Sequence, residues 1–228
     1  MVYQLIGLSV YPLTVNQSRP ASLLPWLRAY NHFLMKRLIL ASRSLRRQEV
    51  LRNAGFEFEV VPSQVEEKNL SGETPAALVE RLARLKAQDV ATKLAPRVDA
   101  LVLGADTVVV VDGTLLGKPH SPQEAAAMLE KLSGKQHEVI TGVALVEPGH
   151  PALAVAHEIT LVFFRPLTRQ EISDYVASSE PLDKAGAYAI QGRAGRFVTR
   201  VEGCYFNVVG LPVALVDRLL REWTSGEA

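Results

Sequence analysis

From residue 36 to the C-terminus, short apolar runs alternate with helix-like patterns, and this alternation limits the fold more than any other feature of the chain. Residues 38–41 form an apolar run, residues 46–53 follow with helical periodicity, and residues 56–62 return to strand character. Thr74 and Pro75 are typical of the cap and first position of a helix, which we expect to run to residue 93. Alternating elements of this kind predict an α/β fold: a mixed twisted sheet with flanking helices, in one domain of two lobes around a cleft.

The second half of the chain continues this alternation. Asp112-Gly113 predicts a hairpin, and Ser121 with Glu124 three residues later predicts a capping box at the start of another helix. Residues 105–107 interrupt an apolar run, residues 183–192 suggest a loop and a strand, and residues 203–212 suggest a shaped loop. The remaining elements that we expect are strands at 138–146, 154–165 and 196–201, and helices at 168–178 and 212–223.

Composition excludes several classes of protein. The 228 residues carry a formal net charge of +1, so no global field draws the chain to nucleic acid or to a membrane surface. The single cysteine, Cys204, excludes an internal disulfide and a thiolate metal cluster, and favours a reducing, cytoplasmic location. Residues 1–34 show no sustained period, signal peptide or membrane span, and we expect a poorly ordered extension before a domain at residues 35–228.

Hydroxyl and guanidinium groups meet where the first strand ends and the first helix begins. Ser42, Ser44, Arg46 and Arg47 occupy this junction. Hydroxyls, the free N–H groups of a helix N-terminus and guanidinium groups together suit a phosphate. The alternative is an ordinary helix capped by Ser42 or Ser44, with its arginines in solvent. The junction alone does not decide between these interpretations.

Asp106 is a lone carboxylate within an apolar segment. A buried carboxylate without a partner is costly, so Asp106 either binds a divalent metal or activates a water, or accepts hydrogen bonds from a turn. Glu66 and Glu67 add further carboxylates, and Lys86 and Lys118 add cations. Glu66 and Glu67 are also typical of a solvated turn, and Lys86 of a helix edge, whereas Lys118 is better placed because the glycine and proline beside it restrain its backbone.

Small residues surround Tyr188 and Gln191 within residues 183–192. Small side chains allow a flat ring to approach closely, and a glutamine amide can recognise the edge of a base through one acceptor and two donors. The alternative is a tight turn that leads into a strand.

Seven strings occur in the order found in one protein family, and they are L-A-S-R-S-L-R-R, V-E-E-K, L-G-A-D-T-V-V, G-K-P, T-G-V-A, D-K-A-G-A-Y-A-I-Q-G and N-V-V-G-L-P. From residue 36 onward the chain therefore resembles the Maf family of nucleoside triphosphate pyrophosphatases. The resemblance implies hydrolysis of a nucleoside triphosphate between its α and β phosphates, with a divalent metal cation, Mg²⁺ or Mn²⁺. It implies that Asp106 accepts a proton from the attacking water or binds the metal, with Glu66 as a second metal residue. The positions that match phosphate contacts are Ser42, Arg47, Lys86 and Lys118.

The string D-K-A-G-A-Y-A-I-Q-G resembles the subgroup that acts on dTTP and UTP, in a house-cleaning role. In that subgroup the positions of Arg46, Thr107 and Gln191 are associated with the choice of base. Leu45 departs from the family pattern, which usually has proline there, and we expect a looser phosphate loop. Two alternatives stay open: a 7-methyl-GTP or broad-range pyrophosphatase, and a nucleotide-binding regulator of cell division without turnover. The family also implies a homodimer.

Overall fold

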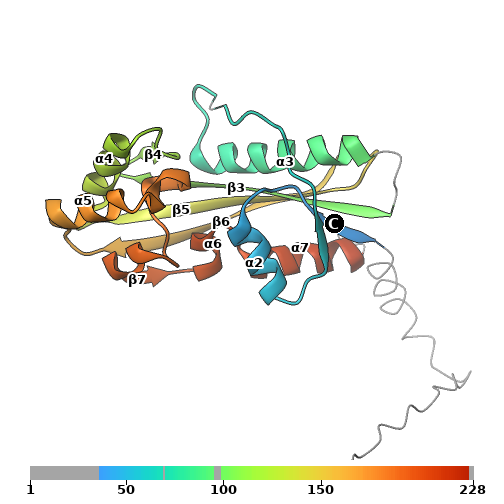
Figure 1. The fold of residues 1–228 in the computed structure, drawn as a ribbon. Helices are drawn as coiled ribbons and strands as arrows, with labels where there is room; N and C mark the ends of the chain where they lie inside the picture. The colour runs from blue at the N-terminus through green and yellow to red at the C-terminus, as the bar shows by residue number, and fades with distance from the viewer. Residues whose placement is uncertain (1–35, 69, 95–98, 226–228) are drawn as a thin grey trace, which may run out of the picture.

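A mixed sheet forms the centre of the molecule in the computed structural model, which describes residues 36–68, 70–94 and 99–225 (Figure 1). Its strands are β1 (Arg37–Leu40), β2 (Phe58–Val60), β3 (Ala100–Val111), β4 (Thr114–Leu116), β5 (Gln136–Val146), β6 (Ala152–Phe164) and β7 (Val198–Glu202). In space they follow the order β2, β1, β3, β5, β6, β7, with β4 paired to β3. β1 is parallel to β2 and β3, and the other pairs are antiparallel. The predicted mixed α/β sheet is confirmed.

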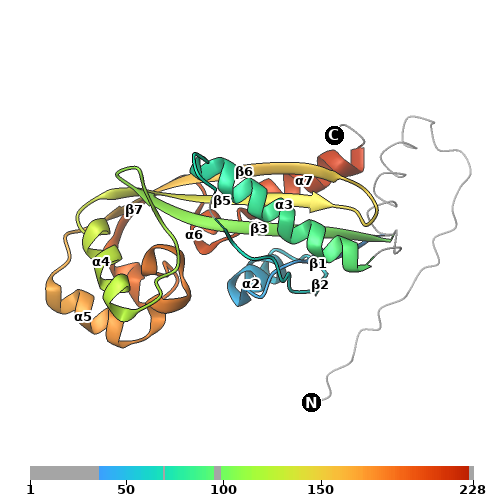
Figure 2. The same cartoon turned by 90° about the horizontal axis from the view of Figure 1, so that it is seen from above.

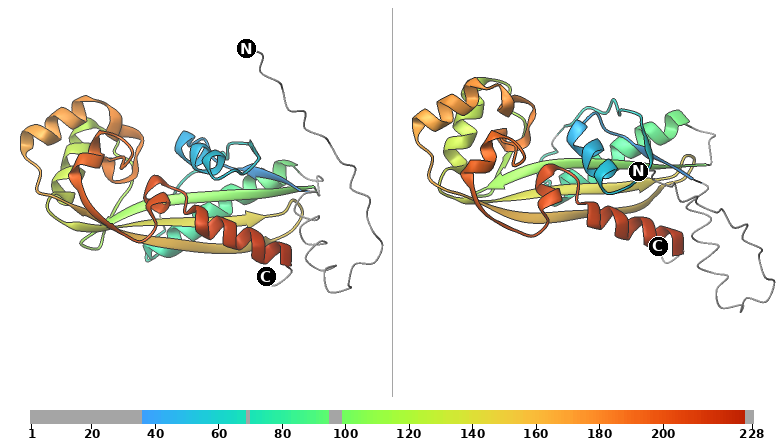
Figure 3. Two further views of the ribbon diagram at one scale, coloured as in Figure 1. Left: turned by 90° about the horizontal axis from the view of Figure 1, so that it is seen from below. Right: turned by 60° about the horizontal axis from the view of Figure 1, so that its bottom comes forward.

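Helices cover both faces of this sheet and build a second lobe at one end of it. α3 (Pro75–Leu94) lies across one face, over β3 and β5 (Figure 2). The opposite face is covered by α2 (Leu45–Asn53), α6 (Tyr205–Val209) and α7 (Val213–Ser225) (Figure 3). The second lobe, at the far end of the long strands, consists of α4 (Pro122–Leu132), α5 (Arg169–Ala177) and the 3₁₀ turns η2 (Glu180–Asp183), η3 (Ala185–Ala187) and η4 (Arg193–Phe197).

Each lobe has its own apolar core, which is why the two lobes can meet at a cleft. Beneath α7, the core of the sheet lobe includes the fully buried Leu40, Leu51 and Leu103. In the helical lobe, Tyr175 and Phe197 pack edge to face, with ring centroids 5.4 Å apart. No helix between residues 36 and 225, leaving aside the gaps in the described range, combines the length and hydropathy that a membrane span requires.

Two glycines bring α3 into direct contact with the sheet. A Cβ atom on Gly104 of β3 would lie 2.1 Å from the carbonyl oxygen of Ala83, and one on Gly142 of β5 would lie 2.3 Å from that of Val79. Only glycine permits this approach, because any side chain would separate helix from strand. The close packing places Lys86 of α3 beside the middle of β3.

The structure confirms most of the predicted elements and corrects three of them. Residues 105–107 do not divide β3, because Ala105, Asp106 and Thr107 pair with successive residues of β5. Residues 183–192 form 3₁₀ turns without a strand, because Gly186 and Ala187 adopt the left-handed region, with φ +68° and +57°. Residues 203–212 contain the short helix α6 where a loop was expected.

One predicted helix start is correct only in part. Ser121 caps α4 and accepts a hydrogen bond from Glu124 N at 3.1 Å, as predicted, but the Glu124 carboxylate accepts from His120 N and not from Ser121 N. The expectation for residues 1–34 lies outside the described residues.

Candidate active site

The candidate site lies where β3 changes its neighbour. β1 pairs with β3 over residues 100–103 and β4 pairs with it over residues 109–111, so within the described chain the edge between these segments has no strand partner. A cleft of about 1450 Å³ opens there between the two lobes. The carboxyl end of a parallel strand, beside a change of strand order, is the usual place for a ligand in an α/β sheet.

The junction between β1 and α2 forms one wall of the cleft. Ser44 is the N-cap of α2, and its hydroxyl accepts a hydrogen bond from Arg47 N at 3.4 Å. The buried Ser42 hydroxyl accepts from Ser44 N at 3.2 Å. Leu45, where the family usually has proline, is the first helical residue and is 77% exposed. The junction is therefore both a capped helix and a wall of the cleft.

The guanidinium of Arg47 donates hydrogen bonds to other groups of the protein. It donates to Gly210 O at 2.7 Å, Ala105 O at 2.9 Å, Thr107 Oγ1 at 2.9 Å and Ser42 Oγ at 3.3 Å. Arg47 thus ties the β1–α2 junction, the open edge of β3 and the segment after α6 into one floor. Burial lowers the Arg47 pKa, although Asp106 and Glu67 favour its charged form.

Thr107 is held in the same hydrogen-bonded network. Besides accepting from Arg47, its hydroxyl lies 2.9 Å from Thr141 Oγ1, and Thr141 in turn donates to Asn207 O at 3.3 Å. Thr107 lines the cleft, but its hydroxyl already has partners within the protein. The structure therefore places this predicted specificity residue within the floor of the cleft.

Asp106 and Glu67 converge on one lysine. Lys86 Nζ lies 2.5 Å from Asp106 Oδ1 and 2.6 Å from Glu67 Oε1, and both Lys86 and Asp106 are buried. Burial raises the Glu67 pKa, but the charge and hydrogen bond of Lys86 and the charges of Lys118 and Arg47 outweigh it, so this pKa lies below its ordinary value. Both carboxylates thus face a common point beside the open edge of β3.

The structure does not bring Glu66 into this group. Its side chain is 74% exposed and pairs with Lys68 at 2.8 Å, and it does not line the cleft. The residues of the same segment that do line it are Ser63, Gln64, Val65 and Glu67. The expected Glu66 is therefore outside the cleft, and its neighbour Glu67 is the carboxylate that lies beside Lys86 and Asp106.

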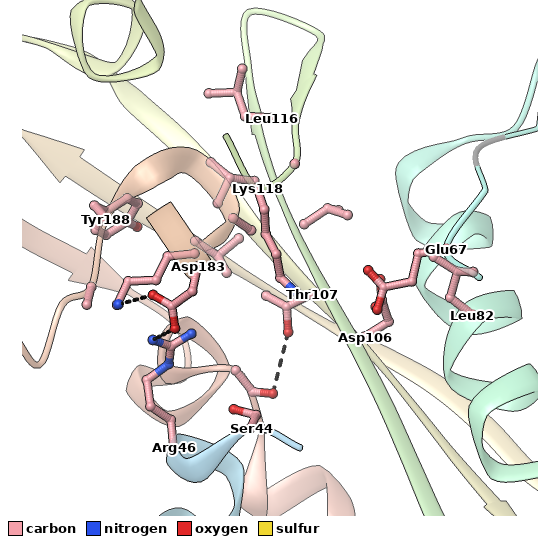
Figure 4. Close-up of a pocket in the computed structure, with 18 of the residues that line it drawn as sticks. Ser44, Arg46, Glu67, Leu82, Asp106, Thr107, Leu116, Lys118, Asp183 and Tyr188 are labelled. Atoms are coloured by element: carbon pink, nitrogen blue, oxygen red, sulfur yellow. Dashed lines mark hydrogen bonds and ion pairs between the residues drawn. The ribbon is translucent and has the colours of Figure 1, made fainter. Parts of the chain in front are cut away.

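The helical lobe supplies the opposite wall of the cleft. Figure 4 shows the Lys118 side chain extending from the connection after β4 toward Thr107 and Asp106. Lys118 is exposed and has no hydrogen bond or ion pair among the described residues. Arg46 reaches across the cleft from α2, and its Nη1 lies 3.9 Å from Asp183 Oδ2 (Figure 4). Two cations thus face the cleft from opposite walls.

Gln191 lies on the exposed rim of this lobe and lines the cleft. Its segment is anchored by Glu180, whose carboxylate accepts from Arg193 N at 3.1 Å. Gly192 lies directly against this carboxylate, and a Cβ atom there would lie 2.1 Å from Glu180 Oε1 and would displace it. Tyr188 is buried, and its hydroxyl lies 2.8 Å from His137 Nε2. The backbone around Gln191 is therefore held firmly while its amide faces solvent.

The donor set at Glu67 and Asp106 fits a magnesium or manganese ion. The described residues contain no group of three or more histidine, cysteine, aspartate or glutamate side chains suited to a metal. Mg²⁺, however, is usually held by one or two carboxylates together with substrate phosphates and waters. Oxygens of both carboxylates already lie within 2.6 Å of one cationic atom, so they can serve a single cation.

Comparisons with known proteins find relatives along most of the chain. A family model described as Maf-like protein matches residues 37–223. The dTTP/UTP pyrophosphatase of Moorella thermoacetica is 53% identical over 186 residues, which are 82% of this chain and 94% of the relative. That of Pelotomaculum thermopropionicum is 50% identical over 189 residues, 83% of this chain and 97% of the relative. Among solved structures, the Staphylococcus aureus Ham1 protein gives a TM-score of 0.46 at 17% identity, covering 85% of this chain and 100% of that one. The chain belongs to the family of Maf-like proteins.

Proposed function

We propose that this protein hydrolyses dTTP and UTP to the nucleoside monophosphate and pyrophosphate. The observation that supports it most is the pair Glu67 and Asp106, whose carboxylates meet in a cleft that also contains the unpaired cation Lys118. Relatives about half identical to the chain are named dTTP/UTP pyrophosphatases. Phosphoryl chemistry mainly requires neutralised charge and correct positioning, and this cleft offers both.

Each wall of the cleft has a part in the proposed reaction. Lys118 and Arg46 bind phosphate oxygens from opposite walls, while Arg47 holds the floor in place and adds a buried positive charge. Asp106 accepts a proton from the water that attacks the α phosphorus, and the bond from this phosphorus to the bridging oxygen breaks to release pyrophosphate. A divalent cation held by Glu67 and Asp106 would neutralise phosphate charge when bound.

A panel of nucleoside triphosphates tests this proposal. The purified protein is incubated with Mg²⁺ or Mn²⁺ and each triphosphate, and the released pyrophosphate is measured. We expect dTTP and UTP to be hydrolysed in preference to the others. A preference for 7-methyl-GTP or a broad range would replace the base assignment, and binding without pyrophosphate release would contradict an enzyme altogether.

Base selection is assigned to Gln191. Its amide offers an acceptor and two donors, which suit the O4 and N3–H edge of a pyrimidine. Gln191→Glu should lower kcat/KM for UTP and dTTP more than for a triphosphate with another base, because the carboxylate loses the donors. The control is Gln123→Glu, on an exposed turn of α4. Equal losses on every nucleotide would show that Gln191 has a structural role. The cytoplasmic location and the homodimer stay predictions.

A further inference from the structure

Lys86 has an unusual position for a phosphate-binding lysine. Its Nζ is bonded to Asp106 Oδ1 at 2.5 Å and to Glu67 Oε1 at 2.6 Å, and its side chain is only 9% exposed. Among the described residues, no other cation is bonded to either carboxylate. Lys86 lines the cleft together with Glu67 and Asp106, and its ammonium is bonded to both of these carboxylates.

We propose that Lys86 is a place-holder, which occupies the cation position between Glu67 and Asp106 while the cleft is empty and leaves it when a divalent cation binds there. An ammonium and a divalent cation cannot both contact the same two carboxylate oxygens, because their charges repel strongly at that distance. The long, flexible stem of lysine allows its ammonium to turn away. Its new partner, a phosphate oxygen of the triphosphate, rests on the proposed function, but the exchange itself does not.

Electrostatics explains why a cation is needed between Glu67 and Asp106 while no metal is bound. Two carboxylates that meet at one point repel each other, and the buried Asp106 also loses hydration, whereas the Glu67 side chain is 44% exposed. This cost would separate the carboxylates or protonate Asp106. Lys86 neutralises the repulsion and keeps both oxygens directed at one point. A permanent structural ion pair would predict the opposite behaviour: loss of Lys86 would release the carboxylates and weaken their binding of a metal.

Mn²⁺ binding without nucleotide distinguishes these two roles. Free Mn²⁺ is measured by electron paramagnetic resonance during titration of the wild type and of Lys86→Gln. We expect Lys86→Gln to bind Mn²⁺ more tightly, on the order of tenfold, because the competing cation is gone. Lys93→Gln is the matched control: it removes the same charge from an exposed position of the same helix, so its affinity should equal that of the wild type. Equal or weaker binding by Lys86→Gln would overturn the proposal.

If Lys86→Gln does not fold, the variant Lys86→Arg provides a second test. A guanidinium can bind two carboxylates through paired N–H groups and holds them more firmly than an ammonium does. We therefore expect Lys86→Arg to bind Mn²⁺ more weakly than the wild type, and equal or tighter binding would contradict the exchange. No nucleotide is present in either titration. If both variants bind Mn²⁺ as expected but the wild type releases no pyrophosphate, only the proposed function is refuted.

Discussion

At the scale of single residues, Asp106 and Thr107 differ in role because neighbouring side chains on a strand point to opposite faces. Asp106 faces α3 and contacts Lys86, whereas Thr107 faces α2 and accepts a hydrogen bond from Arg47. The floor of the cleft therefore has a carboxylate on one side of β3 and a hydrogen-bonded hydroxyl on the other. Only the first is suited to accept a proton.

Asp106→Asn keeps the shape of the side chain and removes its charge. We expect pyrophosphate release to fall by roughly 100-fold or more, the usual contribution of a positioned acid or base. Circular dichroism should show the same fold, because the amide oxygen can still accept from Lys86. Asp112→Asn, at the exposed hairpin after β3, is the control and should keep wild-type activity. Near wild-type turnover by Asp106→Asn would refute the catalytic assignment.

His137 makes the stability of the protein depend on pH. It is 2% exposed, and burial lowers its pKa from 6.5 to about 4. Between these values the unfolded chain binds a proton that the folded protein does not, so the contribution to the free energy of unfolding falls as pH falls, by about 1.4 kcal/mol per pH unit at most. His137→Gln should remove this slope between about pH 6.5 and 4 in urea unfolding.

The control for this experiment is Tyr188→Phe. It removes the hydrogen bond between Tyr188 and His137, which is 2.8 Å long, but keeps the imidazole. Its unfolding free energy should therefore be lower at every pH while keeping the slope of the wild type. A slope that is the same in the wild type and in His137→Gln would contradict the buried neutral histidine.

The sequence does not show which of Glu66 and Glu67 lies in the cleft. As adjacent carboxylates in one motif, the two are equivalent candidates. Residues 61–68 have no regular secondary structure, so no periodicity in the sequence shows which of the two carboxylates faces the cleft. No local pattern predicts that Lys86 bonds to both Glu67 and Asp106, because these contacts require α3 to pack against β3.

At the scale of elements, local signals predicted most helices and strands. Ser44, Ser121 and Thr168 cap α2, α4 and α5 through their own side chains, so each helix start is encoded within a few residues. The continuity of β3 was not predictable in this way. Asp106 interrupts the apolar pattern of β3, but the strand continues through it because it pairs with β5, which lies more than 20 residues further along the chain.

Gly104 tests whether the contact between α3 and the sheet is required. A methyl group there would meet Ala83 O at 2.1 Å, so Gly104→Ala must displace the helix. We expect a loss of about 1–3 kcal/mol in the free energy of unfolding, measured with urea, as for other overpacked sites. The control is Gly117→Ala, which meets nothing within 4 Å and should unfold like the wild type. Unchanged stability of Gly104→Ala would mean that α3 can move without cost.

At the scale of the whole molecule, the site exists only because distant segments meet. Arg46 and Glu67 come from the sheet lobe, whereas Lys118 and Asp183 come from the helical lobe. The order of motifs pointed to several residues that the structure brings to one cleft, Ser42, Arg47, Lys86, Asp106 and Lys118 among them, but it also pointed to Glu66, which does not line the cleft. It did not predict which carboxylate faces which cation, because those pairs depend on how the two lobes are placed across the cleft.

Asp183 pairs with Arg46 across the cleft and with its neighbour Lys184, and under the proposed function a triphosphate that spans the two lobes competes with it for Arg46. Asp183 Oδ2 lies 3.9 Å from Arg46 Nη1, and its side chain is 75% exposed. Asp183→Asn should tighten binding of a non-hydrolysable triphosphate up to about fivefold in calorimetry, since an exposed ion pair contributes at most about 1 kcal/mol.

Two further measurements decide whether this change in affinity comes from the cleft. Asp174→Asn, on α5 of the same lobe, removes the same charge outside the cleft lining and should leave the affinity unchanged. The gain from Asp183→Asn should shrink as salt is added, because exposed charges are screened. If Asp183→Asn instead weakens binding, Asp183 would be a group that aims Arg46 at the phosphates, and the lobes would be held together by this pair before and after the nucleotide binds.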